Sequence, residues 1–484
     1  MASYINPIIT TLMNTYHLAI DLGATSGRAL LATFDGHKIV SEEISRFRYP
    51  MIPLAGHLHW NLPLIYEEVL KAMKIAAEKM KAAGTRLSSV GIDSWGCDVA
   101  YFYADGSLAG LPYCYRDAHT AGAADIFCKE FGKDRLYSIT GIQFMDFNTV
   151  FQLHTLRRNG ARILDCADKI LFIPDALAYM LTGNAVTEFT VASTSQMLNL
   201  VTGDFGADVL EALGLSRDKF GPMTQPGQTI GILTPELQKH TGLGPVPVVA
   251  VAGHDTASAV AGIPAPDSDC AYLSCGTWAL LGIEADHFNV SESARKYNFT
   301  NEGGINGTTR FLKNICGMWI FECVRKELGL EDMDIALLAA SCLDSSCDTI
   351  INPDDPAFAN PSSMTEAIQS YCASNGLDAP VTYADYTRVI FRSLAARVAQ
   401  VLGYLREITN KDIRRLHVIG GGSLNGHLMA MLAETTGLPV VAGPAECTAL
   451  GNILLQIAAT NTPDSPCSLR DIALNSCKTK TYNP

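Results

Sequence analysis

The chain has 484 residues, of which 48% are hydrophobic, and its formal net charge is −13 at pH 7. This length suits two domains better than one core. The negative charge argues against a general nucleic-acid-binding protein, which needs a basic face, but it does not exclude a bound nucleotide. Because no run of 18 apolar residues occurs, we expect no membrane-spanning helix and a cytoplasmic protein, either a monomer or a homodimer.

Residues 1–16 are expected to form an N-terminal tail. They contain no Lys or Arg and only a short apolar stretch, which makes a poor secretory signal. The 14 cysteines of the chain form no CxxC pair, so their spacing does not indicate a zinc site, and we expect reduced thiols.

The first predicted element is a β-hairpin. Its strands are the apolar runs His17–Ile20 and Ala29–Phe34, which flank the Gly-rich turn Asp21–Arg28. A helix with apolar residues at helical spacing is expected over Leu64–Lys81. Further along, buried strands are expected at Ser89–Ile92, Val99–Tyr103 and Val246–Val251, and the middle, Thr140–Leu200, is expected to alternate helices with loops.

A second, weaker copy of the opening hairpin is predicted at Ala271–Ser274 and Trp278–Ile283, around the turn Cys275–Thr277. Strands and helices then alternate to the end of the chain, which indicates sheets covered by helices. The repeated start predicts two related α/β domains around a central cleft, with residues 17–262 in the first and residues 263–484 in the second. The boundary should fall near Gly262–Ser268, where prolines interrupt the pattern.

The opening turn combines an acid, two glycines, two hydroxyls and an arginine within Asp21–Arg28. Glycines let backbone N–H groups approach phosphate oxygens, and an acid at a strand end suits Mg²⁺ or its water. An ordinary hairpin with a surface ion pair explains the same residues equally well. The turn matches neither a P-loop nor a dinucleotide fingerprint.

The triple glycine Gly420–Gly422 lies between the predicted strand Leu416–Ile419 and a predicted helix over Gly426–Thr435. Three glycines at a strand end are costly in conformational entropy, so we favour a backbone that approaches a ligand near a helix N-terminus. The alternative is a flexible connection.

Asp255 follows a predicted buried strand, beside His254 and Thr256. Ligands of open α/β sheets bind at the carboxyl ends of strands, which makes Asp255 a candidate general base. On local grounds a helix N-cap is the better explanation.

Three further segments leave two interpretations open. Asp93–Asp98 could offer Trp95 and Gly96 to a polar ring, or hold a core tryptophan beside a bend. Tyr115–Asp117 could orient a polyhydroxyl ligand, or form a weak surface ion pair. His57 and His59 lack a third partner and are interpreted as polar loop or strand residues rather than metal ligands.

In their order along the chain, these motifs resemble the FGGY family of carbohydrate kinases, within the actin-like, ribonuclease-H-like ATPases. The resemblance runs from about His17 to Leu455 and is strongest to the members that act on L-rhamnulose. It rests on residues 21–28, 91–98, 111–117, 140–144, 147–149, 254–259, 273–278, 301–304, 312–315 and 420–422.

The resemblance implies an ATP- and Mg²⁺-dependent transfer of the γ-phosphate to the 1-hydroxyl of a 6-deoxy-L-ketohexose, with Asp255 as the base. It places the sugar mainly on the first domain and the adenosine on the second. Sugar contacts are implied for Gly96, His254, Asp255, Thr256 and Asn314. ATP contacts are implied for Ala24, Thr25, Ser26, Gly27, Arg28, Thr277, Glu322, Gly421 and Gly422, and a water-mediated Mg²⁺ contact for Asp21.

Two positions depart from the family pattern. His119 follows Tyr115–Asp117 where an arginine is usual, and Glu322 stands where a glutamine is usual. The sugar is therefore expected to be L-rhamnulose, with L-fuculose or another ketose as the alternative. A non-catalytic actin-like sensor of sugar or nucleotide is the competing class, and the presence of Asp255 favours the enzyme.

Overall fold

The computed structural model describes residues 14–264, 269–460 and 468–484. Most of the expected tail over residues 1–16 and part of the expected domain boundary therefore lie outside the described residues. None of the described helices is long and apolar enough to cross a membrane.

The first half of the chain forms a six-stranded sheet. Its strand order is β14 (Gln228–Ile232), β15 (Pro247–Ala250), β6 (Ser89–Ser94), β1 (Thr15–Leu22), β2 (Ser26–Phe34) and β3 (Ile39–Arg48). β1 pairs antiparallel with β2 and parallel with β6, and β15 is parallel to β6. The expected hairpin and the strands at 89–92 and 246–251 are confirmed.

The second half forms a seven-stranded sheet. Its order is β18 (Thr300–Gly303), β19 (Thr309–Cys316), β17 (Trp278–Ala285), β16 (Cys270–Cys275), β20 (Arg415–Ile419), β21 (Val440–Ala442) and β22 (Lys480–Tyr482). β16 pairs antiparallel with β17 and parallel with β20. The series β3-β2-β1-β6-β15 of the first sheet thus recurs as β19-β17-β16-β20-β21. This repeat confirms the predicted fold class of two related ribonuclease-H-like domains.

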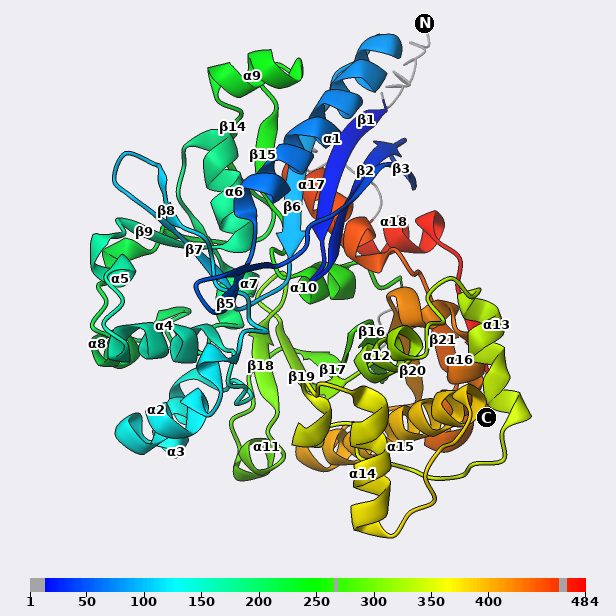
Figure 1. Ribbon diagram of the computed structural model, residues 1–484. Helices are drawn as coiled ribbons and strands as arrows, with labels where there is room; N and C mark the ends of the chain where they lie inside the picture. Colours follow the sequence, from blue (N-terminus) through cyan, green and yellow to red (C-terminus); the bar gives the residue numbers. More distant parts are fainter. Residues whose placement is uncertain (1–13, 265–268, 461–467) are drawn as a thin grey trace, which may run out of the picture.

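Two helices lie between the sheets (Figure 1). α10 (Asp255–Ala261) packs against α17 (Cys447–Thr460), and α17 also packs on β1 and β6. The last helices of the chain, α17 and α18 (Leu469–Ser476), therefore share a hydrophobic core with β1, β2 and β3, although they lie far from them in sequence. Gly451 of α17 allows α17 to pack closely against α10, because a Cβ at this position would overlap the carbonyl oxygen of Ser258 in α10.

Other helices cover the outer faces. α1 (Leu62–Ala82), α6 (Ile173–Thr182) and α9 (Pro235–Thr241) lie on the first-sheet side. The second sheet is covered by α12 (Trp319–Glu327), α14 (Met364–Asn375), α15 (Tyr383–Thr409) and α16 (Gly426–Thr436). α15 begins at a capping box, in which the side chains of Thr382 and Asp385 each bond the other residue's backbone N–H. α11 (Glu292–Lys296) and α13 (Ile335–Ala340) are short surface helices.

A smaller unit extends from the first sheet and has its own core. Its strands are β8 (Leu108–Gly110), β7 (Val99–Phe102) and β9 (Lys169–Phe172), with the pairs β4–β5 (Ile52–Leu54, His57–His59), β10–β13 (Thr187–Glu188, Met223–Thr224) and β11–β12 (Leu198–Asn199, Asp204–Phe205). Its helices are α2 (Ala123–Phe131), α3 (Lys133–Thr140), α4 (Thr149–Arg158), α5 (Ile163–Cys166), α7 (Phe189–Ser193) and α8 (Ala207–Leu213). The expectation of helices and loops alone over 140–200 was wrong, since β9, β10 and β11 lie there.

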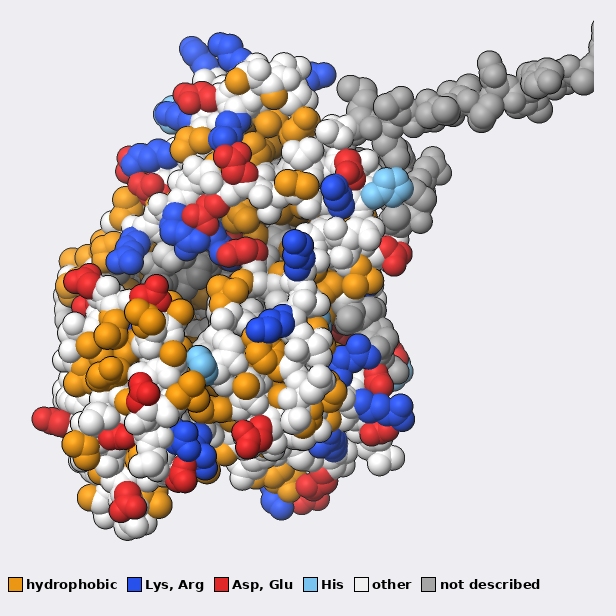
Figure 2. Space-filling model, turned by 90° about the vertical axis from the view of Figure 1, so that its right-hand side faces the viewer, with side chains coloured by type: hydrophobic (Ala, Val, Ile, Leu, Met, Phe, Trp, Pro, Cys, Tyr) orange, Lys and Arg blue, Asp and Glu red, His pale blue; other side chains and the backbone are white. Residues whose placement is uncertain are grey.

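Basic and acidic side chains are interspersed over the face that Figure 2 displays. Among the described residues drawn there, no continuous basic surface of the kind that nucleic acid requires is formed.

Candidate active site

A pocket of about 1310 Å³, part of it open to solvent, is lined by residues of both halves of the chain. Ligand pockets commonly form at such domain junctions. Of the residues expected in the site, the pocket brings together Asp21, Ala24, Arg28, Gly96, His254, Asp255, Thr256, Thr277, Asn314 and Gly421. Thr25, Ser26, Gly27, Glu322 and Gly422 are not among the lining residues.

Three carboxylates come from the carboxyl ends of neighbouring parallel strands. Asp21 on β1 is directly paired with Asp93 on β6, and Asp255 follows β15, which lies beside β6. Burial raises the pKa of Asp93 well above its usual range, and the charge of Asp21 adds to this rise. Burial raises the pKa of Asp255 as well; His254 opposes the rise and Asp21 supports it. The site thus concentrates negative charge where the strands end, which favours a cation or a proton there.

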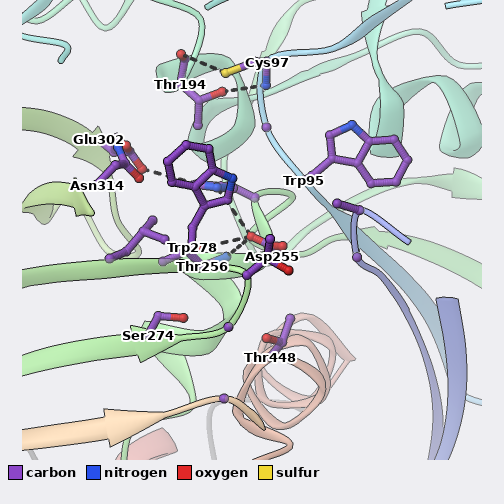
Figure 3. A pocket seen from close by; sticks show the side chains of 18 of the residues that line it. Trp95, Cys97, Thr194, Asp255, Thr256, Ser274, Trp278, Glu302, Asn314 and Thr448 are labelled. Atoms are coloured by element: carbon purple, nitrogen blue, oxygen red, sulfur yellow. Dashed lines mark hydrogen bonds and ion pairs between the residues drawn. The ribbon is translucent and has the colours of Figure 1, made fainter. Parts of the chain in front are cut away.

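Asp255 is the first residue of α10, and His254 occupies the N-cap position without a side-chain capping bond. The Asp255 carboxyl uses Oδ1 to accept from the Thr256 backbone N–H at 2.6 Å and the Thr256 hydroxyl at 3.2 Å, and it lies 3.4 Å from Nε2 of His254. Among the described residues, no hydrogen bond is formed to Oδ2. The side chain keeps 31% of its surface exposed, so Oδ2 can meet a substrate (Figure 3).

The turn between β1 and β2 is closed by a bond from the Gly23 N–H to the Ser26 carbonyl at 3.0 Å. Arg28 donates through Nε and Nη2 to one oxygen of Asp21, at 2.9 and 2.7 Å, and it also forms an ion pair with Glu446. The ion pair is therefore part of the pocket rather than an isolated surface pair. Gly27 faces Leu22 and Phe47, and Thr25 is exposed to solvent, so neither lines the pocket.

The end of the pocket near β6 carries aromatic and amide groups. Trp95 is 5% exposed and donates through Nε1 to Asp98 at 3.0 Å, and Trp60 donates to the same carboxyl oxygen at 2.6 Å. Burial raises the pKa of Asp98 to about 6. Trp95 is thus both the core tryptophan and a pocket wall.

Across the pocket, Asn314 of β19 is held by Gln143 of the first half. Its backbone N–H and its Nδ2 donate to Oε1 of Gln143, at 2.8 and 3.1 Å. This amide pair joins the two halves of the chain, and both of its residues line the same pocket as Asp255.

The opposite end of the pocket is built on the second sheet. Thr277 and Gly421 line it, together with Thr448 at the start of α17. Only Gly421 of the triple glycine has open space around it, because a Cβ at Gly420 or Gly422 would meet Cys275. The helix that follows, α16, begins at Gly426, with the 3-10 turn Gly421–Leu424 between it and the strand. Close packing against Cys275 thus accounts for Gly420 and Gly422, while Gly420 and Gly421 line the pocket.

Comparison with known proteins decides the family. The N-terminal domain model of the FGGY family of carbohydrate kinases matches residues 16–262, and its C-terminal domain model matches residues 271–460. The chain belongs to the FGGY family of carbohydrate kinases. The resemblance seen in the sequence is thereby confirmed.

Relatives in this family are similar over almost the whole chain. A protein of Bacteroides thetaiotaomicron named rhamnulokinase is 45% identical over 98% of this chain and 96% of its own length. A rhamnulokinase of Pectobacterium atrosepticum is 39% identical over 96% and 92%. Among solved structures, a gluconate kinase from Lactobacillus acidophilus superposes with a TM-score of 0.80 at 18% identity, covering 98% of this chain and 94% of its own. This structural similarity shows the shared FGGY fold.

Glu322, one of the two departures from the FGGY pattern, lies on α12 and pairs with Arg325 at 2.9 Å, with its side chain 43% exposed. It does not line the pocket.

His119, the other departure, is buried and contacts Asp117 at 2.8 Å. Asp117 also accepts from His57 at 3.0 Å, while Arg116 lies over the rings of Tyr115 and Trp319. The segment is therefore neither a surface ion pair nor, apart from Tyr115, a wall of the pocket. His57 belongs to the short strand β5, as the open interpretation allowed.

Sequence reasoning assigned no role to several residues that line the pocket. Thr194 comes from the smaller unit, and no local pattern marks it. Gln143 and Asn148 belong to the same unit and lay within recognised family stretches, but they were given no role. Glu302 was part of a recognised family stretch and could have been selected, since a buried acid in a Gly-rich segment is unusual. Trp278 was likewise within such a stretch.

Gly96 offers a test of the pocket wall. A Cβ at this position would meet the Thr194 hydroxyl at 2.7 Å, and that hydroxyl accepts from the Cys97 N–H at 3.1 Å. Gly96→Val should therefore displace Thr194 and narrow the end of the pocket near Trp95. We expect the Kd for sugar to rise by about tenfold or more, an energy of about 1.4 kcal/mol, while ATP affinity stays near that of the wild type. Isothermal titration calorimetry with each ligand measures both, and unchanged sugar affinity would contradict the placement of this wall.

Proposed function

We propose that this FGGY kinase transfers the γ-phosphate of ATP to the 1-hydroxyl of L-rhamnulose, giving L-rhamnulose 1-phosphate. The observation that carries the proposal is Asp255: its Oδ2 is unbonded among the described residues and faces a pocket lined by both halves of the chain. The relatives named rhamnulokinase, at 36–45% identity over nearly the full length, support the choice of sugar.

In this proposal Oδ2 of Asp255 accepts the proton of the sugar 1-hydroxyl as that oxygen attacks the γ-phosphorus. A new O–P bond forms, the bond to the β-phosphate oxygen breaks, and ADP leaves. Burial raises the pKa of Asp255, and a carboxylate with a raised pKa is a stronger general base. Arg28 and the backbone at Ala24 lie on the same pocket wall and would offset the charge of the phosphates.

A magnesium ion fits the donors present only in part. Carboxylate oxygens are its preferred protein ligands, and Arg28 contacts Oδ2 of Asp21 but forms no described bond with Oδ1. Among the described residues, however, no group of three or more potential ligands is arranged to enclose a metal. We therefore assign Asp21 a contact through water, with the remaining ligands supplied by phosphate oxygens and solvent. Bound there, the ion would neutralise charge on the phosphates.

We also propose which half of the chain binds the sugar and which half binds the nucleotide. We assign sugar binding to residues 17–262, through Gly96, His254, Asp255 and Thr256, with Asn314 reaching across from β19. We assign nucleotide binding to residues 263–484, through Thr277 and Gly421. The other residues implied to contact ATP would do so only if the pocket closes further around the nucleotide, which is a known means of excluding water. These residues are Thr25, Ser26, Gly27, Glu322 and Gly422. A cytoplasmic enzyme, monomeric or homodimeric, fits this assignment.

A panel of L-rhamnulose, L-fuculose, L-xylulose and D-xylulose with ATP tests the substrate. We expect L-rhamnulose to have the highest kcat/KM, by at least about tenfold, an energy of about 1.4 kcal/mol at the transition state. A higher value for L-fuculose would replace the sugar and keep the reaction. That alternative rested on His119, which contacts Asp117 instead of lining the pocket. No ADP release with any sugar would favour a non-catalytic sensor.

A further inference from the structure

An ion pair between Glu302, which lines the pocket, and Arg310 is not yet used by the proposed reaction. Arg310 of β19 has a fully buried side chain, and its Nη1 lies 3.1 Å from Oε2 of Glu302, whose side chain is 5% exposed. Arg310 also donates through Nε to the Gly303 carbonyl at 2.8 Å. Buried ion pairs contribute little to stability compared with apolar residues of the same volume, so stability alone explains this pair poorly.

The pair is in contact with His254. Nη2 of Arg310 lies 3.1 Å from Nδ1 of the imidazole, and Oε2 of Glu302 lies 3.3 Å from the same nitrogen. A guanidinium has only donors, so Nδ1 must be the acceptor in its bond with Arg310. A neutral imidazole with a bare Nδ1 carries its proton on Nε2. The 3.3 Å contact with Glu302 is not a hydrogen bond, because Oε2 of Glu302 has no hydrogen-bond partner among the described residues. The bond from Arg310 therefore selects one tautomer of His254.

The selected tautomer points its proton at Asp255. Nε2 of His254 lies 3.4 Å from Oδ1 of Asp255, which already accepts from the N–H and hydroxyl of Thr256. With a proton on Nε2, all three neighbours of Oδ1 are donors, and the carboxyl is held so that Oδ2 faces the pocket. With a bare Nε2, a lone pair would face Oδ1 and repel it.

We propose that Arg310 and Glu302 are positioning residues for phosphoryl transfer, acting through the tautomer of His254 on the orientation of Asp255. This inference rests on the proposed role of Asp255 as the base. Glu302 keeps the buried guanidinium compensated, and Arg310 supplies the donor to Nδ1. In Figure 3 dashed lines run from Glu302 and from Asp255, each of which contacts His254.

The arrangement couples the two halves of the molecule. Glu302 and Arg310 come from β18 and β19 of the second sheet, whereas His254 and Asp255 follow β15 of the first. The base is therefore oriented fully only when the second sheet contacts the loop before α10. A base without this support would have a small error in placement, which can cost about 10²-fold in rate.

Arg310→Lys is the first test. Lysine keeps a positive charge beside Glu302, but it lacks the planar guanidinium group that donates to His254 and Gly303 at the same time. A double variant, Glu302→Gln with Arg310→Gln, removes both charges and leaves neither uncompensated. In each folded variant we expect kcat to fall by about 10²-fold, with the KM for ATP unchanged. In ¹⁵N-histidine NMR spectra, the signal of His254, assigned with a His254→Asn variant, should lose the Nε2–H tautomer of the wild type.

Lys313→Met is the matched control. Lys313 is a buried cation on the same strand, but it donates to the carbonyls of Tyr297 and Asn298 and makes no described contact with His254. We expect it to leave kcat and the His254 signal as in the wild type. A folded Arg310→Lys enzyme with wild-type kcat, or with an unchanged His254 tautomer, would overturn the inference. If Asp255→Asn also retains activity, the proposed base is wrong; if only Arg310→Lys does, the base stands and the positioning role fails.

Discussion

Asp255→Asn should lower kcat by at least about 10²-fold, the usual contribution of a positioned base, while ATP binds as before. The asparagine oxygen can still accept the Thr256 N–H that Oδ1 now accepts at 2.6 Å, so the start of α10 should keep its conformation. The amide cannot take a proton at the position of Oδ2. A coupled assay of ADP release gives kcat, and calorimetry gives the ATP affinity.

Asp286→Asn is a suitable control, because this acid is exposed and lies outside the pocket. Near wild-type turnover in Asp255→Asn would remove Asp255 from the role of base. Loss of ATP binding together with turnover would instead show that the variant disturbs Asp21 and Arg28, which line the same pocket and which we propose to act on the phosphates and Mg²⁺.

The position of Asp255 at the edge of a sheet could be predicted because the ends of the buried strands could be predicted. Buried strands before Asp21, Asp93 and Asp255 were recognisable from their apolar runs, and parallel neighbours bring their carboxyl ends to one edge. The residue type alone favoured a helix N-cap, yet His254 takes that position. The order of motifs along the chain therefore led to the proposed role of Asp255 as the base, whereas local propensity alone would have assigned it a structural role.

The rest of the site depends on contacts that no local pattern encodes. Gln143 meets Asn314 across the junction of the two halves, and Arg310 reaches His254 from another sheet. Side chains on either side of such contacts look ordinary in the sequence, because their partners are set by packing of whole sheets. The same is true of α17, which follows β21 in the chain but packs on β1 and β6.

Gly451→Ala is expected to be the most destabilising single-methyl change in the region between the sheets. The added Cβ would overlap the carbonyl oxygen of Ser258, which is backbone within α10 and cannot rotate away. Overpacking a core costs about 1–3 kcal/mol and occasionally more; because both atoms here belong to helices, we expect more than about 3 kcal/mol. The midpoint of urea unfolding, followed by tryptophan fluorescence, measures the change.

Gly403→Ala in α15 supplies the control, since nothing lies within 4 Å of its added Cβ, and it should stabilise the protein by up to about 1 kcal/mol. Forcing α10 away from α17 would also shift His254 and Asp255 at its start, so folded Gly451→Ala protein should lose kcat as well as stability. Stability and turnover equal to those of the wild type would mean that the two helices can separate without cost. In that case α10 would not be the rigid support that the proposed base requires.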